Sequence, residues 1–265
     1  MQARMGLKNR RAVVTGAAGA IGRASADALL DVGCSVVLVD IDEAGLASAL
    51  EELQERHGTT NVISLVADVT KEEDNKRFVE LCTEKYGGVD IAFLNAGCGP
   101  KYTKNITDTD LEELERLWKV NVVGVFAGLK YSMRAMEEFG GSIICTASAI
   151  ALKGNGGISP YGCSKAAVIN LVQCAAVEGA PNNIRVNGII PGTTKSNMLY
   201  NTLDRMRPDG VDKEAYEQVW KDKIPLNRFG ESQEIANLVL FLAGGMSTYT
   251  TGQILVADGG RTCHG

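Results

Sequence analysis

The chain has 265 residues, of which 45% are hydrophobic and 22% are charged, and its formal net charge is −5. This size and mixture predict one large α/β domain spanning residues 1–265 rather than two small domains. The negative charge argues against a nucleic-acid partner, and the lack of a run of eighteen apolar residues argues against a membrane span.

Seven cysteines and two histidines limit the chemistry further. The cysteines are scattered without a Cys-x-x-Cys pair, so we expect neither a zinc site nor a disulfide framework, and a reducing, cytoplasmic compartment. The N-terminus "MQARMGLKNRR" lacks the apolar segment of a secretory signal. His57 and His264 are more typical of surface residues than of catalysts. We therefore expect no metal site, and a Ser-His-Asp hydrolase is disfavoured.

Short apolar segments alternate with segments of helical periodicity along most of the chain. Most of the apolar segments are continuous, which is typical of strands buried on both faces of a parallel sheet. Gly33 and Gly58 follow the first two helical segments, as C-terminal glycines do. The alternation predicts a doubly wound α/β fold with a seven-stranded parallel sheet and helices on both faces. The expected strands cover residues 12–16, 35–40, 62–68, 89–97, 142–148, 184–192 and 253–260.

One segment, at about residues 196–228, interrupts this alternation. It is longer than a simple connection and places Met198, Leu199, Tyr200, Met206 and Trp220 among many charged residues. Insertions of this length in a compact domain are usually functional or mobile. We expect a helical lid over a substrate pocket.

The first strand leads into a glycine-rich turn, "TGAAGAIG", that opens a helix. Gly16, Gly19 and Gly22 permit a tight turn and a close approach of the backbone to a diphosphate. The helix N-terminus offers free N–H groups and a positive dipole end to that anion. The turn, with Ala20 and Ile21, therefore indicates a dinucleotide-binding site, because it has the strand–turn–helix context that such a site requires.

The second strand ends at Asp40, eighteen residues after Gly22. A carboxylate at this position accepts hydrogen bonds from the hydroxyls of an adenosine ribose and repels a 2′-phosphate. No Arg or Lys stands at Ala17 or Ile41 to compensate such a phosphate, and Asp42 adds negative charge. NAD is therefore preferred over NADP, and Ile41 is expected beside the cofactor.

Two further strand ends point to the same ligand. "ADVT" places Asp68 and Val69 where an adenine could lie. "LNAG" places Asn95, Ala96 and Gly97 at the end of the fourth strand, where small residues let a ribose pass close to the backbone.

Tyr161 and Lys165 are four residues apart on an expected helix that opens near Pro160. This spacing places both side chains on one helix face. A nearby ammonium favours phenolate and lowers the pKa of the phenol, which makes the phenol a general base toward an alcohol or an acid toward a carbonyl. A Tyr/Lys pair at this spacing is by itself more often a surface coincidence.

The surroundings of the pair favour a catalytic site. Ser148 stands at the carboxyl end of the fifth strand, where open α/β sheets bind ligands, and its hydroxyl could hold the substrate oxygen beside Tyr161. Asn121 interrupts the apolar segment "LWKVNVVGVF". Such an amide is either hydrogen-bonded internally or functional, and it could hold a water connected to Lys165.

Together these motifs resemble the short-chain dehydrogenase/reductase family over residues 7–260. The resemblance rests on "TGAAGAIG", Asp68, "LNAG", Asn121, Ser148, Tyr161-x-x-x-Lys165, "PG" at residues 191–192 and the closing "ADGG". It implies a Rossmann-like domain that binds NAD(P). The chain departs from the family pattern at Ala20, where glycine is usual, at Leu94, where asparagine is usual, and at Ala257, where valine is commoner; none of these changes removes a catalytic group.

The resemblance also implies roles for individual residues. Tyr161 would be the general acid/base, Ser148 would polarise the substrate oxygen, and Lys165 would bind the nicotinamide ribose and lower the pKa of the phenol. Asn121 would support a proton-relay water. Beyond the sixth strand, the carboxamide and diphosphate of the cofactor would be held by residues of one turn, namely Pro191, Gly192, Thr194 and Ser196.

The expected function is NAD-dependent interconversion of a secondary alcohol and a ketone, on a small-molecule substrate. Two alternatives are a non-catalytic NAD-binding redox sensor and an enzyme resembling nucleotide-sugar epimerases or dehydratases. The intact tetrad disfavours the sensor, and the short C-terminal region disfavours the epimerase. The pocket wall is expected at residues 98–101, 149–159 and 197–224, and Lys101, Lys153 and Lys195 could attract an acidic group. An apolar or amphipathic ligand is favoured by the larger apolar side chains of these segments, namely Ile150, Leu152, Ile158, Met198, Leu199 and Tyr200. The family resemblance implies a homotetramer or a homodimer.

Overall fold

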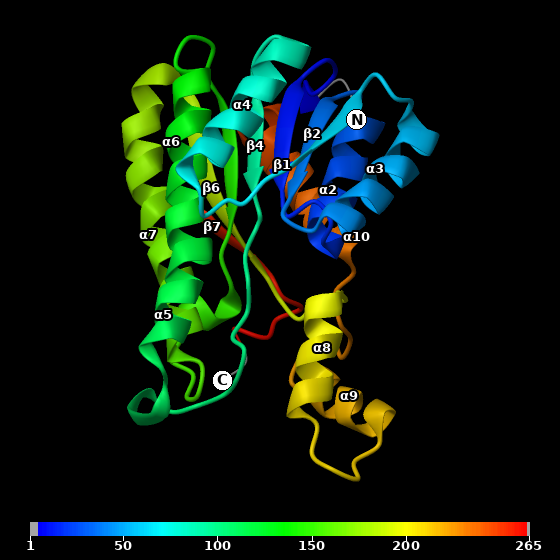
Figure 1. Cartoon of the computed structure of the whole chain (residues 1–265), viewed down its shortest axis with the longest axis vertical. Coiled ribbons are helices and arrows are strands. Elements are labelled where there is room, and N and C mark those ends of the chain that lie inside the picture. Colours follow the sequence, from blue (N-terminus) through cyan, green and yellow to red (C-terminus); the bar gives the residue numbers. More distant parts are fainter. Residues whose placement is uncertain (1–4, 264–265) are drawn as a thin grey trace.

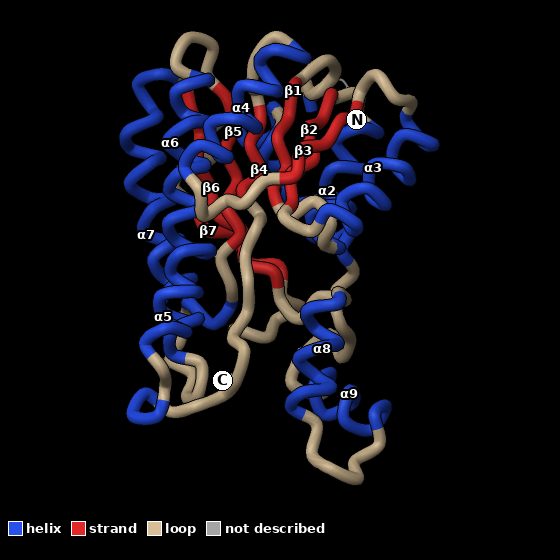
Figure 2. The backbone as a smooth tube through the Cα atoms, viewed as in Figure 1, coloured by secondary structure: helices blue, strands red, loops and turns tan. Residues whose placement is uncertain are grey.

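A single parallel sheet organises the molecule. The computed structural model describes residues 5–263, and within them seven strands, all parallel, follow the order β3-β2-β1-β4-β5-β6-β7. The sheet and the helices on both of its faces confirm the predicted doubly wound fold (Figures 1 and 2). The strands are β1 (Arg11–Thr15), β2 (Ser35–Asp40), β3 (Val62–Val66), β4 (Ile91–Leu94), β5 (Gly141–Thr146), β6 (Ile184–Pro191) and β7 (Ile254–Ala257).

Helices cover both faces of the sheet. The main helices are α2 (Ala20–Asp31), α3 (Glu43–His57), α4 (Glu72–Tyr86), α5 (Leu111–Trp118), α6 (Gly124–Met136), α7 (Ser159–Gly179), α8 (Asn197–Met206), α9 (Lys213–Lys221) and α10 (Ser232–Ala243). A π-helical segment, η2 (Lys119–Val123), joins α5 to α6. Helices α2, α3 and α10 lie on one face, α4, α6 and α7 lie on the other, and α5 packs against α7.

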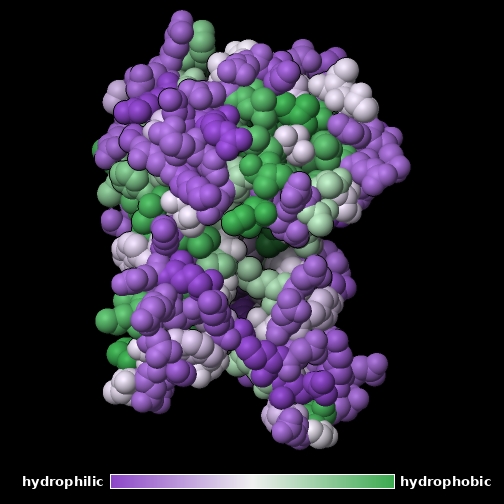
Figure 3. Space-filling model, viewed as in Figure 1, coloured by the Kyte–Doolittle hydropathy of each residue, from purple (hydrophilic) through white to green (hydrophobic). Residues whose placement is uncertain are grey.

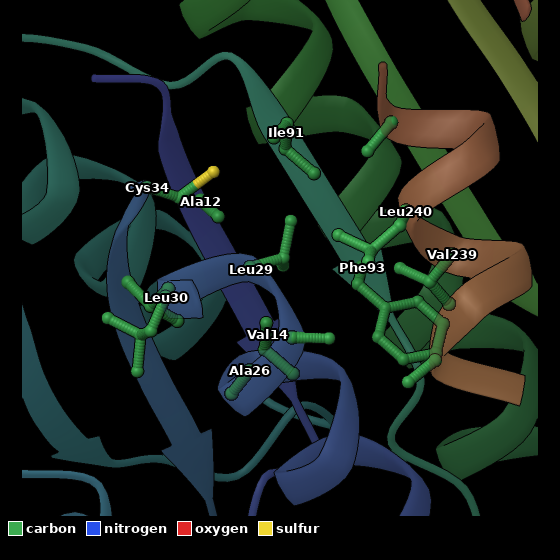
Figure 4. Packing of buried hydrophobic residues seen from close by; sticks show 14 of the residues in the cluster. Ala12, Val14, Ala26, Leu29, Leu30, Cys34, Ile91, Phe93, Val239 and Leu240 are labelled. Carbon is green, nitrogen blue, oxygen red and sulfur yellow. The ribbon is translucent and has the colours of Figure 1, made fainter. Parts of the chain in front are cut away.

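The core consists of one apolar cluster on each side of the sheet. Along β1, Ala12 and Val14 belong to the cluster under α2 and α10, whereas Val13 belongs to the cluster under α4, α6 and α7. Figure 4 shows Phe93 of β4 directed toward Val239 of α10. Because side chains alternate between the faces of a strand and both faces are covered, these strands are continuous apolar segments in the sequence.

Six of the seven strands end earlier than the sequence suggests, whereas β2 ends at Asp40 as expected. The fourth was expected to reach Gly97, but β4 ends at Leu94. The backbone N–H of Asn95 donates to Thr15 Oγ1, 2.9 Å away, and that of Ala96 to the same oxygen at 3.0 Å, instead of continuing the ladder with β5. The chain therefore leaves the sheet at the edge where β1 and β4 lie side by side, which is the point where the strand order reverses.

Helices α8 and α9 form a small lobe beyond that edge (Figure 1). They lie within the expected lid segment and have a cluster of their own, in which Leu199, Leu203, Ile224 and Phe229 are buried. Within residues 5–263, no helix is both long and apolar enough to cross a bilayer.

His57 is not the surface residue that its position suggested. Its side chain is only 13% exposed, and Nε2 lies 2.7 Å from Asp27 Oδ1. The C-terminus of α3 packs beside α2, which brings the imidazole to this carboxylate. His264 lies outside the described residues.

Candidate active site

A cleft of about 1540 Å³ runs along the carboxyl ends of the strands, between the sheet and the lobe of α8 and α9. In Figure 3 the hollow is visible between the body and this lobe. Of the residues expected to bind the cofactor or catalyse the reaction, all but Gly22 and Asn121 line this cleft.

The glycine turn lies at the N-terminus of α2. Gly16 has φ +69°, and a Cβ there would lie 2.9 Å from Asn95 Nδ2. Gly19 is the N-cap of α2, no side chain caps the helix, and Ala20 and Ile21 follow it along the cleft wall. The free N–H groups of the first turn therefore face the cleft, as a diphosphate requires.

Gly22 serves packing and does not line the cleft. A Cβ added to it would lie 2.1 Å from the carbonyl oxygen of Gly16. Only glycine lets the first turn of α2 come this close to the loop, so Gly22 fixes where the free N–H groups point.

Asp40 is held rigidly at the end of β2. Its Oδ2 accepts the backbone N–H of Ala18 at 2.9 Å, and its Oδ1 accepts that of Asp42 at 3.0 Å. Each carboxylate oxygen keeps a further lone pair that could accept a hydroxyl. Ile41 is 66% exposed beside it and lines the same wall.

The sequence did not reveal two arginines at this end of the cleft. Arg23 donates to Glu52 at 3.0 Å and to the carbonyl oxygen of Gly45 at 3.3 Å. Arg56 donates to Glu52 at 2.7 Å and to Asp27 at 2.8 Å. Both guanidinium groups are therefore neutralised by carboxylates. Their helical positions, away from the strand ends, gave no signal in the sequence.

The turn after β4 is fastened to its neighbours by Asn95. Its Nδ2 donates to the carbonyl oxygen of Thr15 at 3.2 Å, and its Oδ1 accepts the hydroxyl of Thr146 at 3.1 Å. Thr15, which was not among the expected site residues, holds the same turn because its hydroxyl oxygen accepts two backbone N–H groups. These bonds tie β1, β4 and β5 together and leave Ala96 and Gly97 on the cleft wall.

The remaining expected cofactor residues lie at the ends of β3 and β6. Asp68 and Val69 line the cleft after β3, and Asp68 Oδ1 accepts the N–H of Thr70 at 3.0 Å. The turn after β6 contributes four lining residues, Pro191, Gly192, Thr194 and Ser196. Ser196 caps α8, since its hydroxyl accepts the N–H of Leu199 at 3.2 Å.

Tyr161 and Ser148 meet in the cleft. Burial raises the pKa of the Tyr161 phenol above its ordinary value, a hydrogen bond with Ser148 lowers it in part, and the nearby Cys98 raises it. The sequence predicted the opposite direction, with Lys165 lowering this pKa. The difference arises because withdrawal from water outweighs the other influences on the phenol.

Lys165 is buried beside the same cleft, with only 4% of its surface exposed. Its Nζ donates to the carbonyl oxygen of Thr146 at 3.0 Å. Burial lowers its pKa from 10.5 to about 8. A Cβ on Gly97 would lie 3.1 Å from this Nζ and 3.1 Å from Asn121 Oδ1. Glycine at this position therefore leaves room for the ammonium.

Asn121 is fully buried in the π-helical segment and lies behind the cleft. Its Oδ1 accepts the N–H of Cys98 at 2.9 Å, and its Nδ2 donates to the carbonyl oxygen of Cys98 and to Ser164 Oγ, both at 3.0 Å. Ser164 in turn donates to the carbonyl oxygen of Tyr161 at 2.8 Å. Of the two possibilities left open by the sequence, internal hydrogen bonding is the one observed.

The chain matches known proteins over nearly its whole length. Residues 16–262 match the family model described as enoyl-(acyl carrier protein) reductase. Levodione reductase of Leifsonia aquatica is 32% identical over 96% of this chain and 94% of that protein. Glucose 1-dehydrogenase of Gluconobacter oxydans is 35% identical over 97% and 93%. The structure of an NAD⁺-bound xylitol dehydrogenase superposes with a TM-score of 0.89 at 32% identity, covering 96% of this chain and 99% of that one.

Fold, cleft and relatives define an oxidoreductase that binds a nicotinamide cofactor and acts on a small molecule. The chain belongs to the short-chain dehydrogenase/reductase family.

Proposed function

We propose that this protein is an NAD-dependent dehydrogenase that interconverts a secondary alcohol and a ketone, with Tyr161 as general acid/base. The observation that carries the proposal is the meeting of Tyr161, Ser148 and Lys165 on the wall of one cleft whose far end holds Asp40. A redox sensor would need the cofactor end alone, and the polar cluster at the other end would then have no use.

The residues of the cleft fit a dinucleotide. The uncapped N-terminus of α2 would hold the diphosphate, and Asp40 would accept the adenosine ribose hydroxyls. Asp68 and Val69 would flank the adenine, and Ile41 would lie beside the ribose. At the other end, the turn after β6 would hold the carboxamide through Thr194 and Ser196.

The chemistry assigns one task to each polar side chain. A bound nicotinamide would supply the hydride acceptor for the alcohol and the hydride donor for the ketone. Tyr161, whose raised pKa keeps the phenol protonated, donates this proton to the ketone oxygen during reduction, and its phenolate form accepts the hydroxyl proton during oxidation. Ser148 donates a hydrogen bond to the substrate oxygen. Lys165 binds the nicotinamide ribose, and Asn121 holds the loop after β4 and the start of α7 in register.

The preference for NAD over NADP rests on charge. Asp40 would face a 2′-phosphate directly, and the nearby Arg23 and Arg56 are already paired with carboxylates. The NAD⁺-bound xylitol dehydrogenase supports the same choice. Free cysteines throughout residues 5–263 fit a reducing, cytoplasmic location, which is part of this proposal.

Replacing Tyr161 by Phe tests the catalytic assignment. The Tyr161→Phe variant keeps the ring but loses the proton, so we expect turnover of a secondary-alcohol panel to fall at least a thousandfold, about 4 kcal/mol in the barrier. Because the phenyl ring preserves the cleft wall, NAD affinity, measured by calorimetric titration, should change by less than a few-fold.

A matched control is Tyr249→Phe, since Tyr249 is fully exposed and outside the cleft. This variant should be as active as the unmodified protein. Undiminished turnover in Tyr161→Phe would remove the phenol from its assigned role.

A further inference from the structure

Charge is divided unequally along the cleft. The carboxylates that line it, within residues 5–263, all come from the region of α2, β2, α3 and the end of β3, where the adenosine would lie; they are Asp27, Asp40, Asp42, Glu52 and Asp68. The other half, beyond β4, has only cationic residues among its charged lining; they are Arg116, Lys153, Lys165, Lys195, Arg205 and Arg261. This is the half that faces Tyr161.

Several of these cations already have partners. Arg116 is paired with the buried Glu113, with its Nε 2.8 Å from Glu113 Oε2. Lys195 is paired with Glu231 at 2.5 Å, and Lys165 has the carbonyl oxygen of Thr146. The charges of Arg116 and Lys195 are therefore neutralised by carboxylates, and Lys165 is assigned to the cofactor in the proposed function.

Lys153 and Arg205 also lack a carboxylate partner within residues 5–263, but both are exposed to solvent, whereas Arg261 is partly buried. Its guanidinium donates to the hydroxyl of the buried Thr193, and no carboxylate of the described part of the chain lies within 4.0 Å of it. A guanidinium has five N–H donors in a planar fork suited to a carboxylate. Because Thr193 takes one of these donors, most of the N–H donors of Arg261 stay available at the cleft wall.

The backbone directs Arg261 into the cleft. Gly259 and Gly260 have φ +65° and +89°, a left-handed pair that turns the chain after β7. A Cβ on Gly259 would lie 2.7 Å from Ile224, so the turn packs tightly under the lobe of α8 and α9. The neighbouring Asp258 is engaged by the N–H groups of Gly260 and Thr262, at 2.9 and 2.8 Å.

The side chain of Arg261 lies against Trp220 of α9, with the guanidinium carbon 5.5 Å from the ring centroid. The contact holds the planar group beneath the lobe. Burial lowers the pKa of this guanidinium, and the nearby negative charge of Asp258 opposes this shift only in part. A desolvated cation of this kind gains strongly from an anionic ligand.

We propose that Arg261 binds a carboxylate of the substrate, so that the substrate is a hydroxy acid in one direction and the corresponding oxo acid in the other. A carboxylate is the fitting anion because a guanidinium without a carboxylate partner in residues 5–263 offers one positive charge and a planar fork of N–H donors. Thr193 holds the guanidinium and Trp220 covers its face, while the hydroxyl or carbonyl of the same molecule lies beside Tyr161. This assignment of substrate class rests on the proposed dehydrogenase function.

The kinetic test compares 3-hydroxy acids of four to ten carbons with their methyl esters, which differ only in the anionic charge. We expect the acids to have at least tenfold higher kcat/KM than their esters. Arg261→Gln should raise KM for the acids at least tenfold, leave the esters unchanged, and leave KM for NAD within twofold. Arg261→Lys should restore part of the preference for acids. Lys223→Gln is the matched control, because Lys223 lies 5.8 Å from the same Trp220 ring but outside the cleft.

The assignment is wrong if esters are used as well as acids, or if Arg261→Gln weakens NAD instead, which would make Arg261 a cofactor residue. A binding test does not depend on turnover. In a Trp118→Phe background Trp220 is the single tryptophan, and its fluorescence is followed while NAD-saturated protein is titrated with hexanoate or with neutral hexanamide.

Selective binding of hexanoate that Arg261→Gln abolishes supports the carboxylate site even if no alcohol in the panel is oxidised, in which case only the dehydrogenase function fails. Equal binding of hexanoate and hexanamide, or no binding of either, overturns the carboxylate site. Turnover of the neutral esters would in that case leave the dehydrogenase function in place.

Discussion

Burial governs the protonation of both members of the Tyr161–Lys165 pair. Four-residue spacing on a helix brings the side chains to one face, as expected, but spacing carries no information about solvent. In the folded chain the pKa of Tyr161 is raised and that of Lys165 is lowered, each toward its neutral form. The buried ammonium of Lys165 therefore destabilises the fold, and its presence is explained by its proposed role in the site.

This cost makes stability depend on pH. The pKa of Lys165 is about 8 in the fold against 10.5 unfolded, so the folded protein binds fewer protons than the unfolded chain between these values. The free energy of unfolding is therefore lowered by roughly 3 kcal/mol below pH 8, and this loss disappears as pH rises toward 10.5.

Lys165→Met removes the charge at similar volume but loses the hydrogen bond to Thr146, worth about 1 kcal/mol. We expect the variant to be inactive yet about 2 kcal/mol more stable at pH 7, by urea unfolding.

The advantage of Lys165→Met should disappear by pH 10.5, where the wild-type lysine is neutral. Lys76→Met, at a lysine whose side chain is 46% exposed, should show no such pH dependence. A variant that is less stable than the unmodified protein at pH 7 would contradict the assigned cost of the buried ammonium.

In the proposed function, the negative charge of Asp40 favours NAD over NADP, and Ile41 adds no cation that would hold a 2′-phosphate. In an Asp40→Ser, Ile41→Arg double variant the carboxylate is replaced by a hydroxyl and a cation is added at the exposed neighbouring position. We expect the ratio of kcat/KM for NADP to that for NAD to rise roughly 100-fold, which corresponds to about 2.7 kcal/mol. Steady-state kinetics with each cofactor measures it. Glu43→Gln, one turn further on and outside the cleft, should leave the ratio as it is.

At the scale of an element, the N-terminus of α2 is positioned by one steric contact. Gly22→Ala would place a methyl group 2.1 Å from the Gly16 carbonyl oxygen, so helix and turn must separate. We expect NAD affinity, measured by calorimetry, to fall at least tenfold and the melting temperature to drop by several degrees. In Gly19→Ala the new Cβ would be 3.3 Å from the same oxygen. The melting temperature of that variant should drop much less, and equal drops in the melting temperature of the two variants would refute the steric explanation.

The connection between α5 and α6 shows how an element can serve a site without reaching it. Asn121 lies in the π-helical segment, and its side-chain amide is hydrogen-bonded to Cys98 and Ser164. Its position in an apolar segment indicated a special role. The hydrogen bonds show that this role is to hold the loop after β4 against α7.

At the scale of the whole molecule, exposed apolar side chains gather along α5, α6 and α7. They include Leu111, Trp118, Val123, Phe126 and Val177. Patches of this kind mark contact surfaces, and we propose that they form the interface of a homodimer or homotetramer. Sedimentation velocity should show an oligomer at micromolar concentration, and Phe126→Lys should shift it toward the monomer.

Phe139→Lys provides the control for this prediction. Phe139 is even more exposed, at 74% against 57%, but follows the end of α6. The oligomer should persist in this variant. A monomeric wild-type protein would show that the apolar patch has another use.

The sequence by itself determined the sheet, its parallel strands and the cofactor end of the cleft. These follow from local rules: continuous apolar segments, glycines where only glycine fits, and Asp40 at a strand end all act through the backbone near them in the chain. Tyr161 and Lys165 could be paired for the same reason, since one helical turn separates them.

Only the tertiary structure decided the rest. It placed Asn121 behind the cleft, reversed the expected pKa shift of Tyr161, brought His57 within hydrogen-bond distance of Asp27, and brought Arg261 from the end of the chain to Trp220. The physical reason is that burial, ion pairing and charge balance depend on residues far apart in the chain, and their distances are set by packing rather than by sequence separation.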